Sequence, residues 1–206
     1  WLRFPITSLL IFLFMTILHF GLSDWSFFRI KKFKYIVSFT YGMSVIFGII
    51  YFNEDQSFII FEYLTNENIY FFQKYLFFPY ILTSVLILYF IYLSIYEKKF
   101  RLGVIEILTL LFIFSLFDPL LAFAIYFCFF HTFKHLYHLI ININSYLRNK
   151  KFVIYSTLIF TFISWVAALV FVFYLFQNYS LYESIIKVIF IGLAALTLPH
   201  MILVDF

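Results

Sequence analysis

The chain has 206 residues, of which 65% are hydrophobic and only 12% are charged. Apolar stretches of membrane length recur along almost all of it, so the composition predicts one integral membrane domain over residues 1–206 and leaves no room for a separate soluble module. The net charge of +4 does not indicate nucleic-acid binding, because most of the Lys and Arg residues lie in three short runs between apolar segments.

The hydrophobic pattern predicts an all-α fold, a polytopic membrane bundle of about seven transmembrane helices. In chain order the predicted segments are Pro5–Phe20, Tyr35–Phe52, Tyr75–Tyr96, Leu102–Phe117, Pro119–Ile140, Phe152–Phe176 and Ser184–Val204. Both Pro5 and Pro119 suit the first turn of a helix, where the missing N–H is harmless. Between the second and third segments, Ser57–Leu64 is expected to form a short interfacial helix.

Basic and acidic loops alternate along the chain and predict its orientation. The basic runs that contain Lys31, Lys98 and Lys150 follow the first, third and fifth segments, whereas Glu54 and Glu183 lie in the opposite loops. By the positive-inside rule the basic loops are cytoplasmic, as in a multi-pass protein of the plasma membrane. Lys187, near the outer end of the last segment, is expected to snorkel to the interface. Since the sequence starts at Trp1 without signal-peptide features, we expect a further N-terminal segment upstream.

The histidines lie inside or at the ends of the apolar segments. At about 1.5 Å per residue, His19 lies roughly 21 Å from the outer end of the first segment, and His131 and His135 lie roughly 18 and 24 Å along the fifth. His200 lies roughly 24 Å along the seventh. Ionisable groups at membrane depth are costly and usually functional, and several imidazoles at one level are suited to hold a transition metal.

Individual motifs support this interpretation, and each also has a purely structural alternative. An H-x3-H pair, His131 and His135, places two imidazoles one helical turn apart, although neighbouring backbone or water could satisfy them instead. Pro199 would bend the last helix just before His200. Two carboxylates could orient a ligand imidazole: Asp24, which could instead cap a helix end, and Glu106, which could instead snorkel to the basic loop.

Three stretches together resemble the Brp/Blh family of bacterial and archaeal membrane β-carotene 15,15′-dioxygenases. The first is His19-Phe20-Gly21 with Asp24, in which Gly21 is expected to weaken the helix just past the imidazole. The second runs from Pro119-Leu120-Leu121-Ala122-Phe123 through Tyr126-Phe127-Cys128 to His131-Thr132-Phe133-Lys134-His135, and the third is Thr197-Leu198-Pro199-His200-Met201. The likeness extends from the first segment to the last residue. An earlier His-Gly-x-x-Asp motif that the family usually carries has no match here.

The resemblance implies non-haem Fe(2+) chemistry in which O₂ cleaves the central double bond of β-carotene into two retinals, typically for a microbial rhodopsin. The expected iron ligands are His19, His131, His135 and His200, with Asp24 and Glu106 in supporting catalytic roles and with His138 dispensable. A hydrocarbon substrate has no charge to recognise, so an apolar, aromatic tunnel that opens to the bilayer is expected. Its expected wall residues are Tyr126, Phe127, Phe130 and Trp165.

The histidine pattern is also compatible with two other classes of protein. A seven-helix zinc amide hydrolase of the ceramidase type also uses an H-x3-H pair and a distant histidine, but no Ser-x3-His occurs here. A non-enzymatic haem-b membrane anchor would take single histidines from two helices as axial ligands, and would leave the H-x3-H pair and Glu106 without a role.

Overall fold

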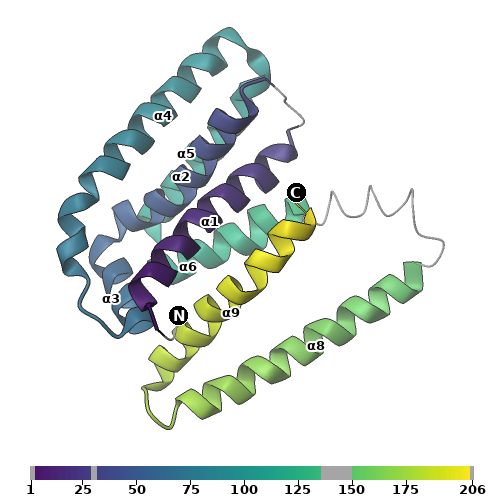
Figure 1. Cartoon of the computed structure of the whole chain (residues 1–206). Helices are drawn as coiled ribbons and strands as arrows, with labels where there is room; N and C mark the ends of the chain where they lie inside the picture. The colour runs from purple at the N-terminus through teal and green to yellow at the C-terminus, as the bar shows by residue number, and fades with distance from the viewer. Residues whose placement is uncertain (1–2, 29–31, 136–149, 205–206) are drawn as a thin grey trace.

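The computed structural model describes residues 3–28, 32–135 and 150–204, which form helices and short connections and contain no strand (Figure 1). This confirms the all-α prediction. The elements are α1 (Pro5–Ser26), α2 (Lys34–Phe52), α3 (Glu54–Thr65), η1 (Tyr70–Tyr75), α4 (Phe77–Tyr96), η2 (Lys98–Phe100), α5 (Arg101–Leu116), α6 (Pro119–Ile125), η3 (Tyr126–His131), α8 (Lys150–Leu175) and α9 (Leu181–Val204).

Four helices of the described residues are long and apolar enough to cross a membrane: α1, α2, α4 and the Leu158–Leu175 part of α8. None of the residues in that part of α8 is buried, and α8 lies at the edge of the molecule against α9 (Figure 1). The predicted fourth segment is the 16-residue helix α5. Membrane crossing by the fourth, fifth and seventh segments remains a prediction.

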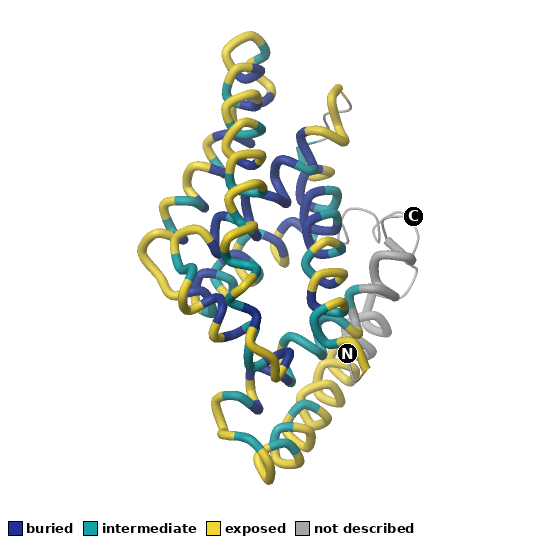
Figure 2. The backbone as a smooth tube through the Cα atoms, turned by 60° about the vertical axis from the view of Figure 1, so that its left-hand side comes forward, coloured by how far each residue is buried: buried dark blue, intermediate teal, exposed yellow. Residues whose placement is uncertain are grey.

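The centre of the bundle is an antiparallel pair, α1 and α2, whose backbones touch. A Cβ atom added at Gly21 would lie 2.2 Å from the carbonyl oxygen of Ser38, and one added at Gly42 would lie 1.9 Å from that of Ile17. Small residues permit such close approach of membrane helices. The prediction that Gly21 weakens the helix after His19 is wrong, because α1 continues to Ser26 and Gly21 serves as a contact point. Figure 2 shows the buried residues gathered inside this bundle.

Replacing Gly42 by alanine is expected to lower the free energy of unfolding by about 1–3 kcal/mol, because the added methyl group must push the backbone of α1 away. Thermal unfolding of the purified protein in detergent measures the loss. Gly192→Ala in α9 is the matched control, since nothing lies within 4 Å of its added Cβ atom. Equal destabilisation by the two substitutions would contradict the close α1–α2 contact.

The ends of the helices agree with the predicted alternation of the loops, whereas the side of the membrane on which each end lies stays a prediction. Lys32, after α1, and Lys99, after α4, both form ion pairs with Glu97, so the first and third loops meet at one end of the bundle. Hydrogen bonds from Lys32 and Lys99 hold the pKa of the Glu97 carboxyl group below its usual value. Lys31 lies outside the described residues, as does the side chain of Lys150.

Cysteine accessibility in a Cys128→Ala background is expected to place Lys98→Cys on the cytoplasmic side and Asp55→Cys, next to Glu54, on the opposite side. A membrane-impermeant maleimide applied to intact cells should therefore label only Asp55→Cys. Lysed cells, in which both positions react, provide the control. Labelling of both from the outside would refute this topology.

Two further predictions concern the segment Ser57–Leu64 and the side chain of Lys187. A helix does form around Ser57–Leu64, as Glu54–Thr65, but it packs inward through Phe58 and Leu64. Lys187 does not snorkel: it is 5% exposed and donates hydrogen bonds to Asn66 at 2.6 Å and to Glu183 at 2.8 Å. The hydrogen bond to Asn66 joins the end of α3 to α9.

Candidate active site

A cavity of about 270 Å³ lies between α1, the α6–η3 segment and α9. Three of the four predicted metal ligands, His19, His131 and His135, line it. The other lining residues are apolar or carry a hydroxyl group: Phe12, Thr16, Phe20, Phe123, Phe127, Thr132, Leu193 and Thr197. The structure therefore brings together imidazoles that are more than one hundred residues apart in the sequence.

The segment that carries the H-x3-H pair is not a regular α-helix. Asp118 caps α6 by accepting hydrogen bonds from the N–H groups of Leu120 and Leu121, and Pro119 lies in the first turn of the helix, as predicted. The helix then widens into a π-helical stretch, Tyr126–His131. In a π-helix, residues five apart stack on one face, so Tyr126 and His131 point the same way.

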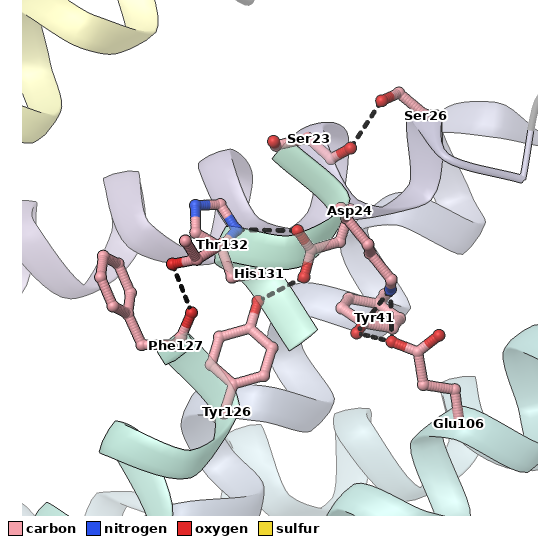
Figure 3. A network of polar contacts seen from close by, with 10 residues as sticks. Ser23, Asp24, Ser26, Tyr41, Glu106, Tyr126, Phe127, His131 and Thr132 are labelled. Carbon is pink, nitrogen blue, oxygen red and sulfur yellow. Dashed lines mark hydrogen bonds and ion pairs between the residues drawn. The ribbon is translucent and has the colours of Figure 1, made fainter. Parts of the chain in front are cut away.

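Both of these side chains contact Asp24, which is fully buried at the end of α1 (Figure 3). Nδ1 of His131 lies 2.7 Å from Oδ1 of Asp24, and the Tyr126 hydroxyl donates to Oδ2 at 2.7 Å. A carboxylate that is ionised only accepts hydrogen bonds, so beside an ionised Asp24 the proton of a neutral His131 belongs on Nδ1, and the Nε2 lone pair then faces away from the carboxylate. A carboxylate behind an imidazole is the usual support of a metal-binding histidine.

The three imidazole rings lie at different distances from one another. The ring centroids of His19 and His131 are 5.2 Å apart and edge-on, whereas those of His131 and His135 are 6.3 Å apart and nearly parallel. Within the described residues, no group of three or more His, Cys, Asp or Glu side chains is placed to hold a metal ion. The side chain of His200, in α9, and the whole of His138 lie outside the described residues. The four-histidine ligand set therefore stays a prediction.

Among the described residues, Glu106 contacts no imidazole. Its carboxylate accepts a hydrogen bond from the Tyr41 hydroxyl (Figure 3). It also accepts one from the Lys134 ammonium group. Lys134 is only 8% exposed, and its Nζ atom also lies 4.8 Å from the centroid of the Tyr41 ring. A buried ammonium group requires a counter-charge, which Glu106 supplies. The sequence analysis did not identify Lys134 as part of the site. A lysine in the middle of an apolar segment was the signal that could have indicated a buried ion pair.

The residues that were predicted to form the wall of a substrate tunnel do not all line the cavity. Phe127 lines the cavity, whereas Tyr126 is buried against Asp24 and Phe130 packs partly buried against the core. The structure does not bring Trp165 to the cavity, because it lies on α8 with 71% of its surface exposed. The sequence analysis missed Phe12 and Thr16 of α1, which follow the i, i+4, i+7 spacing of one helical face with His19.

These features define an all-helical protein with four candidate membrane spans and an apolar cavity lined by histidines. A family model described as Beta-carotene 15,15'-dioxygenase matches residues 1–206. A relative from Uncultured marine bacterium 66A03, named Beta-carotene 15,15'-dioxygenase, is 32% identical over 207 residues, which cover 100% of this chain and 74% of the relative. The chain belongs to the beta-carotene 15,15'-dioxygenase family, and the resemblance is confirmed. No solved structure matches it.

Proposed function

We propose that this protein is an iron-dependent oxidoreductase that uses O₂ to cleave the central 15,15′ double bond of β-carotene into two retinals within the membrane. Membership of the family supports the substrate and the reaction. The observation that carries the proposal is one apolar cavity that contains His19, His131 and His135, with His131 fixed by Asp24.

The donor set fits ferrous iron. Neutral imidazoles bind Fe(II), and a neutral His131 that donates from Nδ1 to Asp24 would offer Nε2 to the metal. In our proposal His19, His131, His135 and His200 would hold the iron. When bound, the iron supplies the activation of O₂ toward the double bond.

The cavity suits a hydrocarbon because its hydroxyl groups are already engaged. Those of Thr16, Thr132 and Thr197 donate to backbone carbonyl oxygens of their own helices, at 2.6, 2.8 and 2.6 Å. They offer no donor to the cavity, so aromatic rings such as Phe20, Phe123 and Phe127 would bind the polyene by dispersion and by exclusion of water. The carbonyl oxygen of a polar substrate such as an amide would find no free hydroxyl donor among these three threonines.

Expression of the chain in cells that synthesise β-carotene tests the function. Cells that contain the protein are expected to lose their orange colour and to accumulate retinal, because central cleavage destroys the long conjugated system. His131→Ala provides the inactive control, and a tag on the protein verifies equal amounts in the membrane. Persistent colour with the unaltered protein present in the membrane would refute the proposal.

A further inference from the structure

A second, smaller cavity adjoins the histidine-lined one. Its volume is about 50 Å³, and Phe12, Thr16 and Phe123 line both cavities, so these three side chains form a common wall. The rest of its lining comes mostly from α2, α3 and α9, with one residue each from α1 and α6, and is almost entirely apolar, including Ile46, Ile49, Ile50, Ile60, Phe61 and Phe190.

The size of this cavity decides between possible occupants. An apolar cavity of about 150 Å³ takes up benzene or xenon, whereas a single water molecule needs only about 10–15 Å³. At about 50 Å³ the second cavity is too small for the methylated ring that ends a carotenoid. It has room for a diatomic gas.

The polarity of the lining disfavours water. A buried water molecule needs two to four hydrogen-bonding partners. The hydroxyl groups at this cavity are those of Ser57 and Thr16, and the Thr16 hydroxyl donates to the carbonyl oxygen of Phe12. The Ser57 hydroxyl, in a side chain that is 3% exposed, has no hydrogen-bond partner. One unpaired hydroxyl does not hold a water molecule, so a small apolar molecule is the favoured occupant.

We propose that the second cavity is a dioxygen site, which takes O₂ from the hydrocarbon of the bilayer and delivers it past Phe12 and Phe123 to the histidine-lined cavity. O₂ is apolar, so it partitions from water into the hydrocarbon of the bilayer and loses no hydrogen bonds on entering such a site. The inference rests on the proposed function, which requires O₂ next to the histidines. Ser57 lines the cavity and its hydroxyl has no hydrogen-bond partner, so that hydroxyl is available to an oxygen atom held there.

Filling the cavity tests this role kinetically. Ile49→Phe is expected to raise the KM for O₂ about five-fold or more, while the KM for β-carotene and kcat at saturating O₂ stay within about two-fold. Ile36→Phe makes the same change on the same helix at a side chain that is 46% exposed, and is expected to leave all three constants unchanged. An unchanged KM for O₂ in a folded, active Ile49→Phe protein would overturn the inference.

Xenon provides a readout that does not depend on activity. Crystals of the full chain pressurised with xenon are expected to show a peak between Ile49 and Ile60 that Ile49→Phe abolishes, and wild-type crystals without this peak would overturn the dioxygen site. Should Ile49→Phe fail to fold, Ile60→Phe fills the same cavity from α3. A wild-type protein that binds xenon but forms no retinal would instead refute the proposed function, so the two failures are distinguishable.

Discussion

Replacing His131 by alanine is expected to reduce retinal formation by about 100-fold or more and to remove the iron from the purified protein. The structure holds His131 in place, since Asp24 contacts its Nδ1 atom and its ring packs against His19 and Phe20. Iron content by mass spectrometry and retinal by chromatography measure the two effects on one sample.

The other histidines make this prediction specific. His19→Ala, His135→Ala and His200→Ala are expected to lose iron in the same way, whereas His138→Ala is expected to retain most of it. Equal loss in His138→Ala would mean that iron content follows general damage to the protein. Full iron occupancy in His200→Ala would show that the proposed ligand set is wrong.

Asp24→Asn is expected to reduce activity by about 10–100-fold, because an amide no longer enforces the proton on Nδ1 of His131. The substitution preserves the size of a side chain that is completely buried. Steady-state rates together with iron affinity measure the effect, and the melting temperature reports any loss of stability.

Tyr126→Phe is the matched control for Asp24→Asn. It removes one hydrogen bond to the same carboxylate but leaves the contact between Asp24 and His131, so a smaller effect of about 10-fold or less is expected. An Asp24→Asn protein with normal iron affinity and normal rates would contradict the orienting role of this carboxylate.

Local signals in the sequence predicted much of the fold. Pro5 begins α1 at its first helical position, and Asp118 caps α6 before Pro119. Long apolar runs predicted α2 and α4 to within two residues at each end. These features depend on the residue itself and its immediate neighbours, because membrane length and proline geometry act locally.

The choice of partners within the site could not be predicted in this way. The rise of 1.5 Å per residue gives the depth of a side chain but not its direction. The π-helical stretch at Tyr126–His131 turns Tyr126 and His131 toward Asp24, and a regular helical period does not anticipate it. Asp24 therefore supports His131 from a helix more than one hundred residues away, rather than His19 on its own helix.

The role of Glu106 also depended on a long-range contact. Its predicted depth in the membrane suggested an imidazole as partner. In the structure its carboxylate instead pairs with the buried ammonium group of Lys134. Lys134 lies between His131 and His135 in the sequence and points to another face of the helix, toward Tyr41 and Glu106. The H-x3-H motif therefore contributes to two neighbouring sites, a histidine-lined cavity and an ion pair.

The stoichiometry of the reaction tests the central claim most directly. Purified protein reconstituted in lipid with ferrous iron and β-carotene is assayed in an oxygen-electrode cell, and the products are separated by chromatography. Central cleavage by a dioxygenase predicts that each β-carotene consumes one O₂ and gives two retinals, with no other aldehyde. Longer apocarotenals, or a loss of β-carotene without uptake of O₂, would contradict it.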